Sequence, residues 1–297
     1  MEPRDGALRC PAYGRADRAD RRTVVRQARV LLVSSCVPAR PCGRKYQLSP
    51  STTLTAPDVP ADNPDLWLGT SPLLDLDDPR LRLRAQALTQ LAATPREKVL
   101  AVYGFVKRLP FAKGFKMRLY TAREVLDHGQ GDSADKATLL VALLRLAGLP
   151  ARIRYLTLHG EIMRGLLPGM PEPTRPVVQA FRDGRWIGTD TYIFDAAYYA
   201  AARRRLQENG WRAGYGISLA GQALWDGDSD AYAGGDPEAD DPLVLSDHGV
   251  FCDPLEFVSS HSYRASHTRL PRALQWNLFS HAMDRAIRDV RPLKDRS

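Results

Sequence analysis

Residues 131–137 hold the side chains that are best placed for chemistry. They read Gly-Asp-Ser-Ala-Asp-Lys-Ala, and the apolar run that follows predicts a helix over residues 133–147. Ser133 would lie at the start of this helix, where free backbone N–H groups and the positive end of the helix dipole stabilise an anion. A serine there is a nucleophile only if a base removes its proton. Asp132 and Asp135 have the simpler role of capping the helix.

Two other polar clusters could bind a metal, but neither has a complete set of ligands. Residues 226–230 begin as a calcium loop does, yet Ala231 stands where that loop requires glycine, and no Glu occupies its twelfth position. His261 and His267 have no carboxylate placed to complete a site with them. We therefore expect a solvated acidic loop, surface histidines, and neither a metal nor another cofactor.

The helices that must position Ser133 are predicted from their capping residues. A capping residue followed by proline marks helix starts at Pro79 and Pro95, and Thr121 with Glu124 forms a capping box for a short helix. The helix over residues 133–147 is apolar around nearly its whole circumference, so we expect it to be central and buried.

An antiparallel sheet is predicted after these helices. Strand patterns cover residues 151–158, 177–182 and 185–191, and Asp183-Gly184 is a hairpin turn between the last two. Helices followed by such a sheet predict an α+β fold. Further predictions are an early strand at 46–54 and helices at 196–208 and 270–290.

The positive charge of the chain is concentrated at its N-terminus. The net charge is +8, and residues 1–45 contribute eleven basic against four acidic side chains. Because the remaining residues are nearly neutral, we do not expect the folded part to bind nucleic acid. We predict a poorly ordered extension at 1–45, a folded domain at 46–195, and a C-terminal extension at 196–297 packed on that domain. An arginine-rich targeting segment is the alternative for residues 1–45.

The remaining composition predicts a cytoplasmic protein without a membrane span. No run of eighteen apolar residues exists in the sequence. The four cysteines, Cys10, Cys36, Cys42 and Cys252, lack metal-ligand spacing and are too few for a disulfide framework. We expect them to be free thiols.

Together these segments resemble bacterial transglutaminase-like proteins. The resemblance covers roughly residues 66–195 and is strongest at 131–152 and 183–190. It implies a papain-like α+β core, with N-terminal helices and a central buried helix packed on an antiparallel sheet. In that family a Cys opens the central helix, a His on a neighbouring strand takes its proton, and an Asp on the next strand orients the His.

At the three family positions this chain has Ser133, Arg175 and Asp190. Arginine stays protonated and has no acceptor atom, so Arg175 cannot take a proton from Ser133. Asp190 facing Arg175 would form an ion pair. Loss of triad members removes about four to six orders of magnitude of rate in related chemistry. His159, at the end of the preceding predicted strand, is the candidate for a substitute base, although a surface histidine is the simpler interpretation.

Two functions follow from this degenerate triad. The first is a pseudoenzyme that binds a peptide-like ligand or a protein partner without thiol acyl transfer. The second is an amidase or peptidase type of hydrolase or acyltransferase in which Ser133 acts with His159. We favour the first because binding needs no base. The sequence leaves catalytic activity, the ligand and the oligomeric state open.

Overall fold

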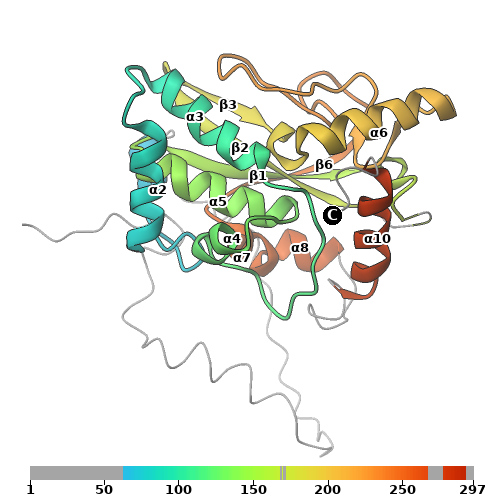
Figure 1. Cartoon of the computed structure of the whole chain (residues 1–297), viewed down its shortest axis with the longest axis horizontal. Helices are drawn as coiled ribbons and strands as arrows, with labels where there is room; N and C mark the ends of the chain where they lie inside the picture. The colour runs from blue at the N-terminus through green and yellow to red at the C-terminus, as the bar shows by residue number, and fades with distance from the viewer. Residues whose placement is uncertain (1–62, 168, 170–171, 267–276, 292–297) are drawn as a thin grey trace, which may run out of the picture. The chain divides into compact units, whose positions relative to one another are not determined.

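Helices, a four-stranded antiparallel sheet and a small two-stranded sheet build an α+β fold, as the sequence predicts (Figure 1). The structure is a computed structural model, and it describes residues 63–167, 169, 172–266 and 277–291. Its helices, with η for 3-10, are η2 (Pro64–Leu68), α2 (Pro79–Thr89), α3 (Pro95–Arg108), α4 (Ala122–His128), α5 (Ser133–Leu146), η3 (Gly160–Met163), η4 (Thr191–Ile193), α6 (Ala196–Asn209), α7 (Pro254–Ser259), α8 (His261–Ser266) and α10 (Ser280–Val290). Its strands are β1 (Ala151–Leu158), β2 (Thr174–Arg182), β3 (Arg185–Thr189), β4 (Ala213–Gly214), β5 (Ile217–Ser218) and β6 (Val244–Phe251).

The capping residues start the N-terminal helices where the sequence predicts them. Asp78 accepts hydrogen bonds from the first backbone N–H groups of α2. Thr94 and Thr121 form capping boxes with Glu97 and Glu124 at the starts of α3 and α4. Each box satisfies backbone donors that a helix start would otherwise leave free.

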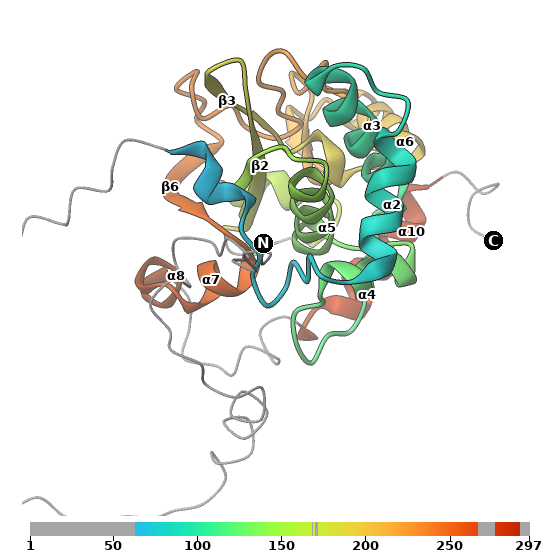
Figure 2. The same ribbon diagram turned by 90° about the vertical axis from the view of Figure 1, so that its left-hand side faces the viewer.

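The central helix α5 is buried, as its sequence predicts. Every residue from 135 to 145 is buried, and Leu139, Leu140, Leu143 and Leu144 are fully so. On one side α5 contacts α2, α3 and α4, and on the other it contacts β1 and β2. Figure 2 shows α5 between the sheet and α2. Burial of each leucine side chain contributes about 1.5–3 kcal/mol, so α5 forms the middle of the core.

The four-stranded sheet has the order β3-β2-β1-β6, and all its pairs are antiparallel. The hairpin between β2 and β3 turns at Asp183 and Gly184, whose φ angles are 51° and 81°. Both angles are positive, as a two-residue hairpin requires. Strand β2 begins three residues before the predicted strand, and residues 191–193 form η4 instead of continuing β3.

Strand β6, at the edge of the sheet, was not predicted from the sequence. Most of its residues are exposed or half-buried, and its pairing with β1 contains two register shifts. An edge strand with polar residues on both faces lacks the alternation by which strands are predicted. The predicted strand at 46–54 and residues 270–276 of the last predicted helix lie outside the described residues.

The C-terminal part packs on the same core. The described residues from Pro64 onward belong to one compact unit, and α10 contacts α6. Arg291, just after α10, donates two hydrogen bonds to Asp195, the residue that caps α6. Among the described residues, every helix is too short or too polar to cross a bilayer.

The expectation of free thiols is wrong for Cys252. This buried residue follows β6 and is disulfide-bonded. The other three cysteines of the chain lie outside the described residues. This disulfide could not be predicted from the sequence. A dense disulfide framework shows a pattern of cysteine spacings, but a single bridge between residues far apart in the sequence does not.

Candidate functional site

Ser133 is the first residue of α5, and Asp132 caps the helix. The serine is half-buried, and its hydroxyl makes no hydrogen bond or other polar contact with any residue that the structure describes. No hydrogen bond therefore joins Ser133 to Arg175, Asp190 or His159.

Two backbone donors in the first turn of α5 are already occupied. Asp132 Oδ1 accepts from the N–H groups of Ala134 and Asp135 at 3.1 and 3.2 Å. The carboxylate of Asp135 accepts in return from the backbone N–H of Asp132 at 3.2 Å. An oxyanion arriving beside Ser133 would compete with the Asp132 carboxylate for these donors.

Two lysines neutralise this buried carboxylate pair. They come from the connection between α3 and α4, and both Lys113 Nζ and Lys116 Nζ lie 2.7 Å from Asp132 Oδ2. Lys116 Nζ also lies 2.5 Å from Asp135 Oδ2. Burial opposes ionisation of Asp132, but the two ammonium groups outweigh it and lower the pKa of this carboxyl. Burial and the neighbouring charge of Asp132 raise the pKa of Asp135 to about 6.

Arg175 and Asp190 form a buried ion pair. Arg175 Nη1 lies 3.4 Å from Asp190 Oδ2, and Arg175 Nη2 donates to the carbonyl of Gly216 at 2.5 Å. Asp190 accepts from the backbone N–H groups of Ala233 and Gly234 at 2.5 and 3.2 Å. Burial raises the pKa of Asp190, against the opposing effect of Arg175. Asp190 is therefore held by a guanidinium and by backbone donors, and it orients no imidazole.

The chain after α6 covers this ion pair. A Cβ atom at Gly234 would lie 3.2 Å from both Asp190 Oδ2 and Leu158 Cδ1, so glycine permits the close approach. In the register of the sheet, Arg175 lies opposite Leu156. Tyr155, next to Leu156, is buried and stacks on Phe257 of α7, with the two ring centres 3.7 Å apart. Because side chains alternate along a strand, Leu156 and Arg175 start from the other face of the sheet.

His159 lies on the surface at the end of β1. It caps η3, and its Nδ1 accepts from the backbone N–H of Glu161 at 3.3 Å. The described structure thus brings Arg175 and Asp190 together, and neither Ser133 nor His159 forms a hydrogen bond or ion pair with either of them.

Two buried lysines that the sequence analysis missed hold the turn after Asp190. Lys107 Nζ donates to the carbonyls of Thr191 and Phe194 at 2.8 and 2.9 Å. Lys136 Nζ donates to the carbonyls of Leu109 and Ile193, both at 2.8 Å. Their signal in the sequence is a lysine at a core position of each helix. Burial lowers the pKa of both groups, that of Lys107 to about 8.

These lysines predict how stability depends on pH. The ordinary pKa of lysine is 10.5, so between pH 8 and 10 the unfolded chain binds a proton that folded Lys107 has released. The free energy of unfolding should therefore rise with pH in this window, by up to about 1.4 kcal/mol per pH unit for one group. Urea denaturation should show the slope reduced in Lys107→Met and retained in Lys98→Met, a change on the same helix. Stability that falls from pH 8 to 10 would contradict this.

A second pair missed in the sequence joins β1 and β6. Thr157 Oγ1 and His248 Nε2 are 2.7 Å apart. A hydroxyl bonded to an imidazole is the contact from which a nucleophile and its base are built, but it is also an ordinary pair between neighbouring strands. Neither Thr157 nor His248 was predicted as a site residue from the sequence, because strand β6 itself was not predicted.

Each carboxylate of the calcium-like loop has a structural partner. Asp226 accepts from the backbone of the loop itself, and Asp230 accepts from the N–H of Gly188 at 2.6 Å. Asp228 pairs with Arg96 and Arg182. No group of three metal-binding side chains occurs among the described residues.

Trp186 of β3 lies among other aromatic side chains. Trp186 packs against Phe181 and Trp67, with the guanidinium of Arg152 3.9 Å from its ring centre. His261 is exposed at the start of α8 and His267 lies outside the described residues.

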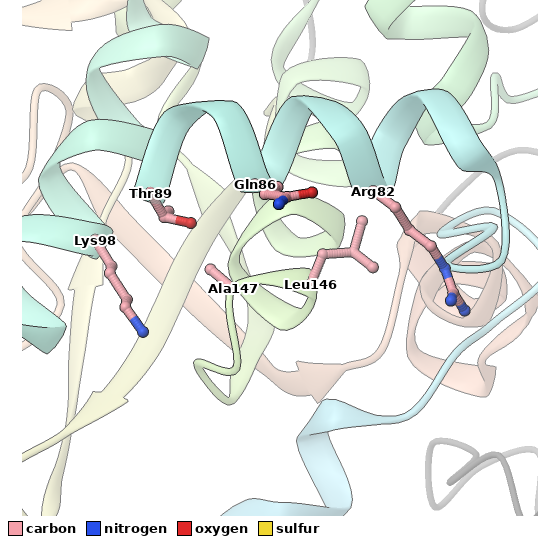
Figure 3. Close-up of a pocket in the computed structure, with 6 residues that line it drawn as sticks. All are labelled: Arg82, Gln86, Thr89, Lys98, Leu146 and Ala147. Atoms are coloured by element: carbon pink, nitrogen blue, oxygen red, sulfur yellow. The ribbon is translucent and has the colours of Figure 1, made fainter. Parts of the chain in front are cut away.

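A shallow depression of about 390 Å³ lies at the other end of α5 (Figure 3). Arg82, Gln86 and Thr89 of α2 form one wall, and Lys98, Leu146 and Ala147 complete it. Leu146 ends the helix that Ser133 begins, so this depression is separate from the candidate site.

One family profile and two solved structures are similar to parts of this chain. Residues 82–213 match the sequence profile of the transglutaminase-like superfamily. A candidate cysteine protease from Cytophaga hutchinsonii is 25% identical, with a TM-score of 0.36, and the match covers 48% of this chain and 45% of that one. A candidate protease from Parabacteroides distasonis is 19% identical, with a TM-score of 0.29, over 42% of this chain and 26% of that one.

The chain spans less than half of the length of either neighbour. No curated protein matches the chain. The profile match spans α3, the central helix that begins at Ser133 and the hairpin that leads to Asp190. Residues 82–213 of this chain are therefore a transglutaminase-like domain.

Proposed function

We propose that this transglutaminase-like domain binds a peptide-like ligand or a protein partner and does not carry out acyl transfer. The observation that carries the proposal is the buried ion pair of Arg175 and Asp190. If these residues occupy the family's base and orienting positions, the base is a guanidinium without an acceptor atom, and the carboxylate is committed to it. Ser133 then has nothing to take its proton.

The start of α5 supports the same conclusion. Acyl transfer needs donors aimed at the developing oxyanion, and here Asp132 occupies two of them. The half-buried Ser133 hydroxyl, which has no partner among the described residues, remains available for a hydrogen bond to a bound peptide group.

Two assays with the same glutamine peptides test the proposal. We expect no amine incorporation and no hydrolysis, and we expect calorimetric binding that Ser133→Arg abolishes by blocking the helix start. Turnover that is lost in both Ser133→Ala and His159→Ala would instead support a serine enzyme with His159 as its base. Absence of both turnover and binding would contradict the binding function.

The disulfide at Cys252 bears on the proposed cytoplasmic location. Structural disulfides persist in oxidising compartments and are rare in the cytosol. We expect mass spectrometry of protein denatured at once after lysis to find Cys252 alkylated only when a reductant is added first, which would place the protein outside the cytoplasm. Alkylation of Cys252 in the denatured protein without reductant would support the cytoplasm.

A further inference from the structure

Two arginines and two aromatic rings form a stack beside the end of α6. The guanidinium carbon of Arg164 lies 5.1 Å from the ring centre of Trp211. The rings of Trp211 and Tyr215 are stacked with their centres 5.8 Å apart, and the guanidinium carbon of Arg205 lies 5.9 Å from the ring centre of Tyr215. We call these four residues the arginine stack. A guanidinium that lies against a ring keeps N–H donors free at its edge, and Arg164 already binds Glu161 at 2.8 Å.

Tyr215 places its ring in the arginine stack from a strained backbone position. It lies with Gly216 in the two-residue turn between β4 and β5, and its φ angle is 52°. Such turns require positive φ angles, which are rare for a residue as bulky as tyrosine. A Cβ atom at Gly165 would collide with the tyrosine ring, so glycine at that position makes room for it. Strained positions of this kind are concentrated at functional sites, where the surrounding structure maintains them.

Two further arginines beside the arginine stack have no acidic partner. Arg204 precedes Arg205 on α6, and Arg212 directly follows Trp211. Both Arg204 and Arg212 are exposed, and neither pairs with a carboxylate among the residues that the structure describes. The backbone N–H of Trp211 donates to the carbonyl of Leu206 at 2.9 Å, which holds the chain before Arg212 against the end of α6.

Positive charge is therefore in excess at this surface, although the chain beyond residue 45 is nearly neutral as a whole. Residues 203–212 contain four arginines and one acidic residue, Glu208. Arg205 donates to the backbone carbonyl of Asp289 on α10, and Figure 1 shows α6 and α10 close together. A local excess of guanidinium groups attracts an anionic partner.

The geometry of the arginine stack favours an acidic protein segment over a nucleic acid. Its two rings already contact each other and one guanidinium each, whereas single-stranded nucleic acids bind where rings are open for bases to stack. A duplex is bound by basic residues spread along a whole face, and the excess here is confined to the end of one helix. Carboxylates need only the edges of guanidinium groups, which the rings hold in a fixed orientation.

We propose that the arginine stack, together with Arg204 and Arg212, binds an acidic segment of a partner protein. Arg164 and Arg205 are only half-buried, so carboxylates of the partner can reach their edges. Arg204 and Arg212 supply the charge that the stack itself lacks. The inference uses no residue of the ligand site proposed at Ser133, so either proposal can fail without the other.

Fluorescence anisotropy with a labelled peptide of ten glutamates tests the inference on the full-length protein. We expect saturable binding that weakens with salt, because the contacts are exposed ion pairs. Arg204→Glu with Arg212→Glu should weaken binding about tenfold or more, since each change replaces attraction by repulsion. The matched control is Arg84→Glu with Arg108→Glu, which makes the same change of charge at two exposed arginines of α2 and α3.

A change that removes no charge tests the role of the rings. Trp211→Leu should weaken binding of the glutamate peptide by at least about threefold, because Arg164 and Tyr215 lose the ring that orients them. Trp211→Phe keeps a flat ring and should retain most of the binding. Thermal melting ensures that all variants are compared in the folded state, and equal binding by wild type and a folded Trp211→Leu would contradict the role of the stack.

A photoreactive form of the peptide locates the contact, since residues 1–45 are basic as well. We expect cross-links within residues 203–215. Cross-links confined to residues 1–45 would overturn the inference, and so would equal loss of binding in the arginine variant and its control. Tighter binding of a ten-nucleotide thymidine strand, lost in the same arginine variant, would make this surface a nucleic-acid site instead.

Discussion

Replacing Asp195 with alanine lowers the free energy of unfolding by about 3–5 kcal/mol, because it leaves a buried arginine without its partner. Asp195 accepts two hydrogen bonds from Arg291, at 2.8 and 2.6 Å, and one from the backbone N–H of Phe111 at 2.9 Å. It also caps α6 through the N–H of Tyr198. The side chains of Asp195 and Arg291 are only 10 and 11% exposed, so water cannot replace the lost contacts. Urea denaturation at pH 7 measures the change.

A matched control separates this contact from the general cost of removing a charge. Glu208 is exposed on the same helix α6, and Glu208→Ala should change stability by less than about 0.5 kcal/mol. A loss for Asp195→Ala as small as that for Glu208→Ala would show that the C-terminal segment is not fastened to the core through Arg291.

The largest expected gain in thiol reactivity comes from introducing, at the same time, the two residues that the family has at positions 133 and 175. In Ser133→Cys with Arg175→His, the thiol stands at the positive end of α5, and the imidazole replaces a guanidinium beside Asp190. A thiol pKa lowered by one unit raises the thiolate fraction at pH 6 about tenfold. We expect alkylation by iodoacetamide at pH 6 to be at least about tenfold faster in the double variant than in Ser133→Cys alone.

Arg175→His alone is the control for this experiment, since it adds no thiol at the site. Equal alkylation rates in the folded double and single variants would mean that an imidazole at position 175 does not reach the start of α5. The assignment of Arg175 to the base position would then be wrong, while the transglutaminase-like fold would stand.

The elements around the site could be predicted from the sequence because their signals are local. The capping boxes at Thr94 and Thr121, the apolar run after Asp132 and the Asp183-Gly184 turn each lie within a few residues of the structure that they specify. Such local signals place Ser133 at a helix start and bring Asp190 to the end of β3.

Contacts between distant segments could not be predicted in this way. Lys116 meets Asp132 across a loop, Arg291 meets Asp195 across 96 residues, and Asn277 meets Lys116 across 161. None of these pairs has a spacing pattern, because the tertiary fold alone brings the partners together. For the same reason the cover that residues 216–234 form over Arg175 left no trace in the sequence.

The central claim is that Ser133 is not an activated nucleophile, and reaction with a fluorophosphonate tests it most directly. This reagent phosphonylates serine hydroxyls that a neighbouring base activates, and it leaves ordinary serines unmodified. Mass spectrometry of the full-length protein should show no adduct on the peptide that contains Ser133 after prolonged incubation at pH 8. A stoichiometric adduct on Ser133 that is absent in His159→Ala would contradict the claim and identify a serine hydrolase.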